Sequence, residues 1–328
     1  MAFSRNSFAC LLAPLWLLTA AAPTVFSQTV ASLHLPVLGH LFDAASGALR
    51  TIEGFPGAAM ADASLPAQLR WRQAHIAPSQ QYALAVPEQD SRLWLVPLGA
   101  SPSLSRAMDE IAPLPREVVF SPSGALALVV SDDILQLMTG LPDRPTKGRS
   151  MPVSALGETP GFLALAEDGT VAMTGNPARL IDPAGQILPL PVDGAVTAFS
   201  FQPGSAGALV VIAGQRRVIW LRHPGLYPEA LEWGEADGIR NPVAAELSGD
   251  RRRLFVLEDG GSLLVIDTSG ESSTMRLACE CVPNGLVRLN GEDVFLLNGS
   301  PNWPSRTLRV LDGARLRIVF VPVERGNQ

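Results

Sequence analysis

Two cysteines near the C-terminal end of the chain, Cys279 and Cys281, have the spacing that most directly suggests chemistry. In an extended strand, residues i and i+2 share a face but lie about 6.5–7 Å apart, which is too far for most disulfides. Pro283 and Gly285, just beyond the pair, favour a local bend that would bring the sulfur atoms together. A disulfide within this loop and two partly buried thiols both remain open. No redox or metal role is predicted, because no histidine or third cysteine lies nearby in the sequence.

The histidines and paired carboxylates show no pattern that completes a catalytic or metal site. The four histidines are dispersed, without the paired spacing of a zinc-binding helix, and are His34, His40, His75 and His223. Asp132 and Asp133 form an acidic pair where an apolar strand should end, but the Asp-x-Asp-x-Asp-Gly run of a calcium loop is missing. A Gly-x-Ser-x-Gly elbow is also missing. We therefore predict no metal site and no cofactor.

Other charged residues have patterns that fit turns. Four aspartates each precede the glycine of an expected turn, where the side chain can accept hydrogen bonds from backbone amides further on; they are Asp43, Asp182, Asp267 and Asp312. We predict that these carboxylates close turns of the outer hairpins rather than take part in catalysis. The basic run from Arg251 to Arg253 follows Ser248-Gly249-Asp250 and is interpreted as a solvated hairpin, with an anion site as the alternative.

A repeat of about 44 residues must position these side chains. Seven segments share an apolar strand, a polar turn ending in glycine and a second strand. Their turn glycines span 266 residues in six intervals and stand at positions 47, 99, 140, 185, 225, 270 and 313. A mean interval of about 44 residues lies in the range of one four-stranded propeller blade.

A second turn marker recurs between these glycines. It consists of an apolar strand, a short turn rich in Pro, Gly or Asp, and another apolar strand. It begins near Ile76, Phe120, Leu165, Phe201, Leu247 and Leu289. Two interleaved hairpins per repeat indicate four strands per repeat. Gly or Pro interrupts most windows that could hold a helix, so few helices are expected.

Two segments carry a resemblance to a known repeat family. The segment from Phe120 through Ser121-Pro122-Ser123-Gly124 to Asp133 resembles the inner strands of WD-like and YVTN-type β-propellers. Leu264–Gly270 is similar to the outer hairpin of the same repeats. The resemblance covers most of residues 36–323 and implies a propeller fold. The Trp-Asp pairs of true WD repeats are absent. The whole chain also resembles uncharacterised exported bacterial propellers, for which the family name implies no activity.

These patterns together predict an all-β protein folded as a β-propeller. We expect seven blades of four antiparallel strands, because stacking blades around an axis buries both faces of each sheet. The ring should be closed by a strand from residues 29–36, which would complete the first blade or pair with the last. Six or eight blades, or a pair of β-sandwich domains, are the alternative architectures.

The first 27 residues have the pattern of a secretory signal peptide. Arg5 precedes an uncharged, leucine-rich run that Pro14 and Pro23 interrupt, so the apolar stretch is short for a membrane span. Val25 and Ser27 are small enough for the cleavage site, which predicts a mature propeller domain of residues 28–328. An uncleaved membrane anchor is the alternative. We therefore expect a periplasmic or extracellular protein with no stable membrane insertion after cleavage.

The charge balance excludes some partners. The chain has 25 basic and 31 acidic residues and a formal charge of −6, which the removal of Arg5 would change to −7. Electrostatic capture of nucleic acid or of an anionic membrane surface is therefore not expected.

The favoured function is an exported monomeric propeller that binds or scaffolds a protein, a glycan or a small ligand. Its candidate polar residues at the channel or rim are His40, His75, His223, Asp132 and Asp133. The alternative is a propeller enzyme of lactonase, lyase or quinone-dependent dehydrogenase type, with its site at the central channel. Convergence at the channel of two or more of the four histidines, Glu167 and Glu246 would favour the enzyme.

Overall fold

The computed structural model describes residues 35–64, 69–99, 104–111, 113–156, 161–224, 229–269, 273–298 and 307–323. The chain divides into two units, Met1–His34 and Leu35–Gln328, and every described residue belongs to the second. The predicted signal peptide, with Cys10, and His34 therefore lie outside the described residues.

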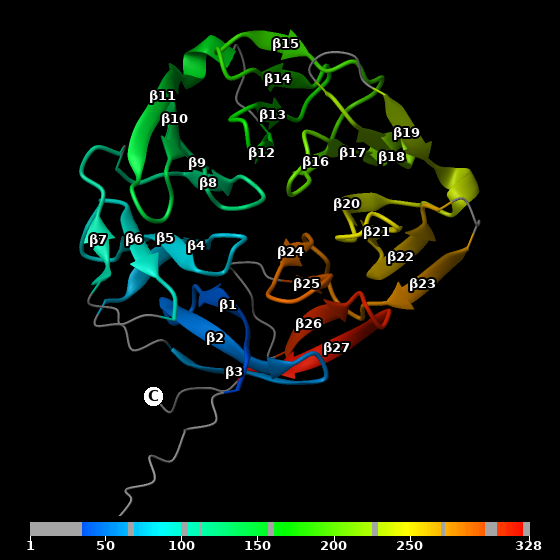
Figure 1. Ribbon diagram of the computed structural model, residues 1–328, viewed down its shortest axis with the longest axis horizontal. Helices are drawn as coiled ribbons and strands as arrows, with labels where there is room; N and C mark the ends of the chain where they lie inside the picture. The colour runs from blue at the N-terminus through cyan, green and yellow to red at the C-terminus, as the bar shows by residue number, and fades with distance from the viewer. Residues whose placement is uncertain are drawn as a thin grey trace, which may run out of the picture. The chain divides into compact units, whose positions relative to one another are not determined.

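Seven antiparallel sheets form a ring around a central channel (Figure 1). We number them as blades 1 to 7 in chain order. Within each blade the strands follow one another from the channel outward, so that β1, β4, β8, β12, β16, β20 and β24 are the inner strands. The prediction of an all-β, seven-bladed propeller is confirmed. Six blades have four strands each, and blade 1 has three among the described residues.

The first four blades contain β1 to β15. Their strands are β1 Val37–Asp43, β2 Ala48–Phe55 and β3 Ala58–Ser64 in blade 1; β4 Trp71–Ile76, β5 Tyr82–Pro87, β6 Trp94–Pro97 and β7 Arg106–Ala107 in blade 2; β8 Glu117–Phe120, β9 Ala127–Val130, β10 Ile134–Thr139 and β11 Thr146–Pro152 in blade 3; and β12 Leu163–Leu165, β13 Val171–Met173, β14 Arg179–Ile181 and β15 Ile187–Pro189 in blade 4.

The last three blades contain β16 to β27. Their strands are β16 Ala198–Phe201, β17 Ala208–Ile212, β18 Arg217–Leu221 and β19 Ala230–Trp233 in blade 5; β20 Pro242–Leu247, β21 Arg253–Glu258, β22 Ser262–Asp267 and β23 Thr274–Ala278 in blade 6; and β24 Val287–Arg288, β25 Val294–Leu296, β26 Thr307–Asp312 and β27 Arg317–Pro322 in blade 7. The helices of the described residues are short 3-10 turns at Val153–Leu156, Ala213–Gln215 and Glu235–Asp237.

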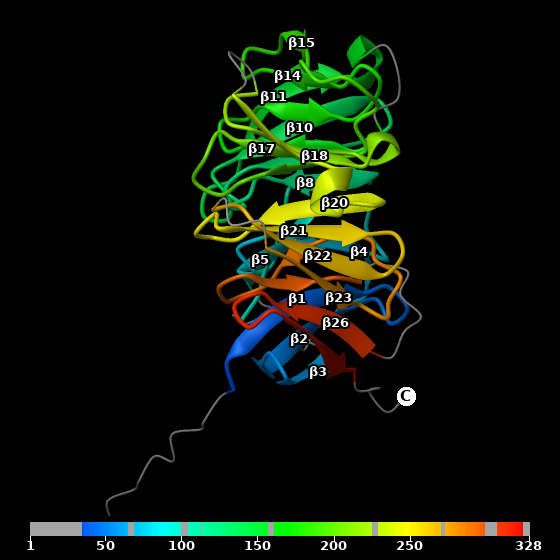
Figure 2. The ribbon, with the colours of Figure 1, turned by 90° about the vertical axis from the view of Figure 1, so that its right-hand side faces the viewer.

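The apolar runs of the sequence become the second strands of the blades. The strands β5, β9 and β17 are buried along their whole length, because neighbouring blades cover both of their faces. By contrast, the outer strands β11, β19 and β23 contain only exposed and partly buried residues. The edge-on view in Figure 2 shows how the strands run between the two faces of the ring.

The core is divided among the contacts between blades. Seven clusters of buried apolar residues are present, and each joins two neighbouring blades around the ring. The cluster that closes the ring packs Leu38 and Ile52 of blade 1 against Leu296 and Val310 of blade 7. Each blade therefore depends on its neighbours to remove its apolar faces from water.

The first glycine marker was assigned to the wrong hairpin. Six of the seven segments ending in a turn glycine join the third and fourth strands of a blade, as predicted, but the turn at Gly47 joins β1 and β2. Asp43 is therefore not in an outer hairpin. The cause is that the β1–β2 turn of blade 1 has the sequence pattern that the later blades have in their third-to-fourth turn. Because β1 is the innermost strand, this turn belongs to the first hairpin of its blade.

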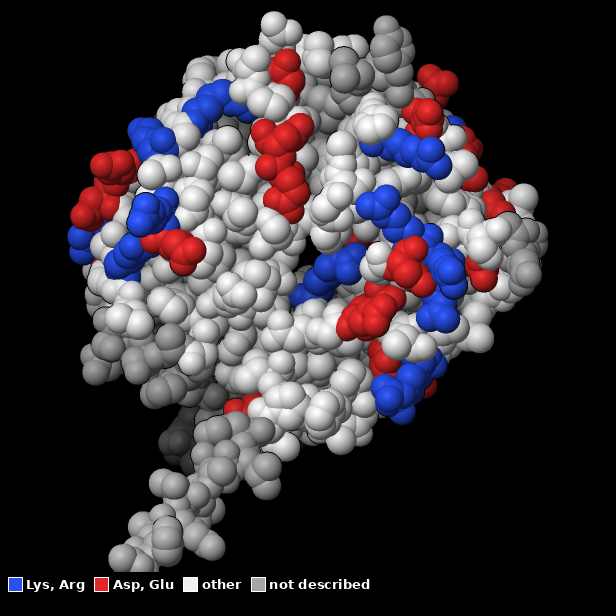
Figure 3. Space-filling model, viewed as in Figure 1, with Lys and Arg blue, Asp and Glu red and all other residues white. Residues whose placement is uncertain are grey.

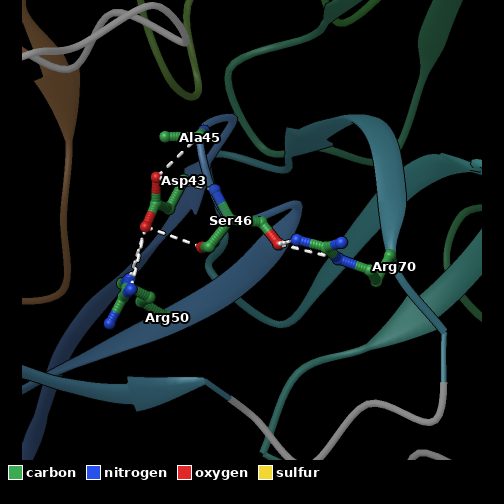
Figure 4. Close-up of polar contacts among 5 residues, drawn as sticks. All are labelled: Asp43, Ala45, Ser46, Arg50 and Arg70. Atoms are coloured by element: carbon green, nitrogen blue, oxygen red, sulfur yellow. Dashed lines mark hydrogen bonds and ion pairs between the residues drawn. The ribbon is translucent and has the colours of Figure 1, made fainter. Parts of the chain in front are cut away.

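Asp43 still closes its turn (Figure 4). Its carboxylate accepts hydrogen bonds from the Ala45 amide at 3.1 Å and the Ser46 hydroxyl at 2.7 Å, and it pairs with Arg50 at 2.8 Å. Burial alone would raise the pKa of Asp43, but these bonds outweigh it and hold the pKa below its ordinary value. Arg70 donates to the Ser46 carbonyl at 3.2 Å, which ties the turn to the segment entering blade 2. The same role is confirmed at Asp182, Asp267 and Asp312, whose carboxylates accept bonds from amides two to four residues further on.

The ring closes where blade 7 meets blade 1. The proposed closing strand lies almost wholly outside the described residues, and the inner position in blade 1 that motivated it is filled by β1. Asn290 donates to the carbonyls of Leu38 and Val37 at 2.8 and 3.1 Å. Val323, just beyond β27, forms a parallel bridge to Ala61 of β3. The described closure therefore combines an apolar interface, inner-strand hydrogen bonds and a contact from the C-terminal strand.

Candidate ligand-binding site in the central channel

The inner strands of blades 2 to 7 enclose a cavity of about 340 Å³ in the channel. Each of these six blades contributes at least one side chain, because the propeller turns every inner strand toward the same axis. This volume is within the range of sites that hold small organic ligands. Figure 3 shows the channel as a hollow at the centre of the ring, with basic atoms at its edge.

Most of the cavity wall is apolar. Three phenylalanines, Phe120, Phe199 and Phe201, line it together with aliphatic residues such as Ile76. Phe162 and Val287 also line it, yet 44% and 45% of their surfaces are exposed to solvent. Exposed apolar side chains beside a cavity are typical of a ligand-binding surface.

An ion pair between blades 6 and 7 supplies one charged part of the wall. Arg288 of β24 contacts the carboxylate of Glu246 of β20 at 3.1 Å and donates to the Leu247 carbonyl at 2.9 Å. The Glu246 carboxylate also accepts hydrogen bonds from Ser200 and, at 3.1 Å, from Gln202. Burial raises the pKa of Glu246, while these partners stabilise its charged form. Because the carboxylate is already held by three side chains, its arrangement favours a structural role.

The polar chain continues from blade 7 to blades 2 and 1. Gln80 donates to the Arg288 carbonyl at 3.1 Å and accepts a bond from the His40 amide at 2.7 Å. Gly39 makes room for this contact, since a Cβ atom there would lie 3.2 Å from Oε1 of Gln80 and 2.7 Å from the side chain of Leu289. The ring of His40 is buried and lies 3.3 Å from the Thr51 hydroxyl.

The 44-residue repeat also sets the spacing of these contacts. Gln202 and Glu246 are 44 residues apart, as are Ser123 and Glu167 in the turns of blades 3 and 4. Adjacent blades place the ends of their inner strands side by side, so hydrogen bonds form between residues about one repeat apart.

Glu117 differs from Glu246 because its carboxylate has no hydrogen bond or ion pair within the described residues. It lies at the start of β8 and lines the cavity. Burial raises the pKa of Glu117, and the positive charge of Arg116 only partly opposes this shift. Its carboxyl group is therefore free to bind a hydrogen-bond donor or a cationic group of a ligand.

The structure separates the other sequence candidates. His75 lies on β4, and its Nε2 atom is buried without a partner among the described residues. His223 lines a different cavity, between blades 5 and 6. Asp132 and Asp133 are exposed in the turn between β9 and β10. In the part of the chain that the structure describes, no hydrogen bond or ion pair joins any two of His40, His75, His223, Glu167 and Glu246, and no cluster of three potential metal ligands is present.

Sequence reasoning missed Glu117, Arg288 and Phe162 as channel residues. A signal was present for the first two, because each lies in the apolar strand that precedes a first-to-second turn marker. Which side chain of a short inner strand reaches the axis depends on the twist of the blade, and the sequence pattern does not contain that information.

A disulfide links Cys279 and Cys281 just after β23. The Cα atoms are 5.1 Å apart, which is shorter than the spacing of an extended strand. Glu280, between them, has a φ of 50° and so provides the bend. Cys279 is fully buried in the apolar cluster between blades 6 and 7, which places the bridge at a blade interface rather than at the channel.

This ring and its channel define the class of the protein as a seven-bladed β-propeller. The chain is similar to a functionally unknown protein from Desulfotomaculum acetoxidans DSM 771, with a TM-score of 0.59 and 12% identity over 87% of this chain and 95% of that one. It is also similar to Hsv2 from Kluyvelomyces marxianus, with a TM-score of 0.52 and 12% identity over 89% of this chain and 99% of that one. These likenesses show the fold alone. No family model and no curated protein matches the chain.

Among the described residues, no helix has the length and apolar character needed to cross a membrane.

Proposed function

We propose that this propeller is a non-enzymatic binding protein that holds a small, mainly apolar ligand in its central channel. The observation that carries the proposal is the 340 Å³ cavity with exposed Phe162 and Val287 on its wall. Burying these side chains against a ligand would contribute binding free energy, at about 25 cal/mol per Å² of apolar surface removed from water.

The free carboxyl group of Glu117 suggests how such a ligand would be oriented. An apolar body would contact the phenylalanines, while a hydroxyl, amide or amine group would bind Glu117. Arg288 and Glu246 satisfy one another, so a ligand need not neutralise either of them. The preferred ligand is therefore amphipathic, with one polar end.

Binding is favoured over catalysis by the arrangement of titratable groups. An acid–base mechanism needs groups within hydrogen-bond reach of a common reacting atom. The sequence candidates for that role lie apart, and Glu246 is engaged by three side chains. A channel wall dominated by apolar residues supports the favoured binding function over the enzyme alternative.

The proposal includes export to the periplasm or beyond as a monomer. The signal-like segment of residues 1–27 supports export, and the Cys279–Cys281 disulfide fits an oxidising compartment. We also propose that the repeats belong with WD-like and YVTN-type propellers, on the resemblance around Phe120–Gly124. Sequencing the N-terminus of protein recovered from the cell envelope or medium tests the cleavage after Ser27.

Titration with Nile red, a neutral dye whose emission rises in apolar surroundings, tests channel binding. The dye should bind the purified protein, and Phe162→Ser should weaken binding by about tenfold, because an apolar contact of that size is lost. Phe320→Ser is the matched control: Phe320 is 52% exposed but lies on the outer strand β27. Equal dye affinity in both variants, or no dye binding to the wild type, would contradict the proposal.

A further inference from the structure

A second cavity, of about 410 Å³, lies between blades 5 and 6, away from the inner strands. Blade 5 contributes Trp220, Arg222 and His223 around the end of β18 and Trp233 from β19. Blade 6 contributes Arg251 from the turn between β20 and β21. We call this cavity the blade 5–6 groove. Basic side chains gather over these two blades on the face seen in Figure 3, with acidic ones among them.

The charges of the groove favour an anion. No acidic residue is among its lining residues, whereas two arginines and a histidine are. Arg222 pairs with Glu229 at 2.9 Å, and both side chains are largely exposed, so this pair is weak. The Arg251 guanidinium forms no hydrogen bond or ion pair within the described residues. It is therefore available to bind a carboxylate with two parallel hydrogen bonds.

The backbone of Arg251 is fixed although its side chain is unpaired. Its amide donates to the Ser248 carbonyl at 2.9 Å, and its carbonyl accepts from the Thr268 hydroxyl at 2.6 Å. Its φ is 60°, in the left-handed region that few residues other than glycine adopt. Glycine would be less strained in this conformation, yet the chain has an arginine here, whose side chain lies at the edge of the groove.

Two indole rings provide the apolar part of the groove. Trp220 is almost fully buried and packs closely over Gly207, where a Cβ atom would collide with the ring. Trp233 is partly buried beside it, and Leu231 is 52% exposed. Neither indole N–H donates a hydrogen bond within the described residues. Indole rings present a flat apolar surface and one polar donor, which suits a ring-shaped ligand with polar edges.

We propose that the blade 5–6 groove binds an acidic saccharide, a sugar ring that carries a carboxylate. The C–H face of a sugar ring packs against an indole, the carboxylate pairs with Arg251, and the hydroxyls offer acceptors to the indole N–H groups of Trp220 and Trp233. An aromatic acid has the flat ring and the carboxylate, but it lacks the hydroxyls and would leave these indole donors without acceptors. This site is separate from the channel and does not depend on the proposed channel ligand.

The test uses the trimer of galacturonate as the probe and intrinsic tryptophan fluorescence as the readout. The trimer should change the emission of the purified protein in a saturable manner, and rising salt should weaken the binding. Arg251→Gln should weaken the affinity by at least about tenfold, because the neutral amide cannot form the two charge-assisted hydrogen bonds of the guanidinium. Arg252→Gln is the matched control, because Arg252 is exposed and adjacent to Arg251 but does not line the groove. This variant should bind the trimer as the wild type does.

Three outcomes would overturn the proposal. The first is no saturable response to the trimer at millimolar concentration. The second is equal weakening by Arg251→Gln and Arg252→Gln, which would show a general charge effect. The third is a preference for maltotriose, which is neutral, or for phenylacetate, an aromatic acid. A Phe162→Ser protein that still binds the trimer would show that the groove acts independently of the channel.

Discussion

His75 is a single residue whose environment makes the stability of the fold depend on pH. Burial lowers the pKa of its ring from 6.5 to about 4, and the same holds for His40. In the unfolded chain each ring takes up a proton near pH 6.5. Between pH 6.5 and 4 the unfolded state therefore binds more protons than the folded state, so the free energy of unfolding falls as the pH falls.

We predict that His75→Leu reduces this pH dependence. The loss of unfolding free energy between pH 7.5 and pH 4.5 should be about 2 kcal/mol smaller in the variant than in the wild type. Urea unfolding at both pH values measures the difference. Burial raises the pKa of Glu117 and Glu246, which acts in the opposite direction, but these groups are common to both proteins. Parallel pH profiles would show that the ring of His75 is not protected from protonation.

Single residues also show where sequence reasoning succeeds and where it fails. The turn-closing aspartates were predictable because their bonds reach only a few residues along the chain. Glu117 was not, because its role depends on five other inner strands, of which β4 comes earlier in the sequence and the other four come later. Local chemistry can be inferred from a sequence, whereas convergence at an axis requires the twist and register of each blade.

At the scale of elements, the contact between β20 and β24 joins two blades through a buried ion pair. Glu246 and Arg288 keep only 13% and 23% of their side-chain surface exposed. The Arg288 guanidinium also lies 4.8 Å from the ring centroid of Phe295, so the side chain is fixed on several sides. Removing one charge would leave the other buried without its partner, which costs more than losing both.

We predict that Arg288→Met lowers the free energy of unfolding by about 3 kcal/mol at pH 7.5. The double variant Glu246→Leu/Arg288→Met should be less destabilised than the single variant, since no unpaired charge remains. Arg92→Met is the control, because Arg92 forms exposed ion pairs and its loss should cost less than about 1 kcal/mol. A double variant that is destabilised as much as Arg288→Met, or more, in urea unfolding would contradict a buried, coupled pair.

The elements also explain the single misassigned hairpin. The sequence pattern of Leu41–Gly47 matches the third-to-fourth turns of later blades, yet β1 and β2 form the first hairpin of blade 1. An apolar strand, an Asp turn and a second strand suit either position, since both hairpins bury one face against a neighbour. The order of the strands in the sheet and the bonds from Asn290 of blade 7 to Leu38 and Val37 distinguish the two.

At the scale of the whole molecule, one repeat length accounts for both the core and the channel. Seven apolar clusters fill the seven interfaces between blades, so no blade can be buried without the ring. The same arrangement brings six inner strands to a common cavity. The mean spacing of about 44 residues made the ring predictable from the sequence. The cavity was not predictable, because the side chains that fill or leave open a channel vary from blade to blade.

The most direct test of this account is amide hydrogen exchange with and without saturating Nile red. The account predicts slower exchange on binding in segments that recur about once per repeat, at β4, β8, β12, β16, β20 and β24, with little change in the outer strands. Slower exchange confined to one continuous stretch of chain, or to outer strands such as β27, would contradict a ligand site built at the axis of the ring.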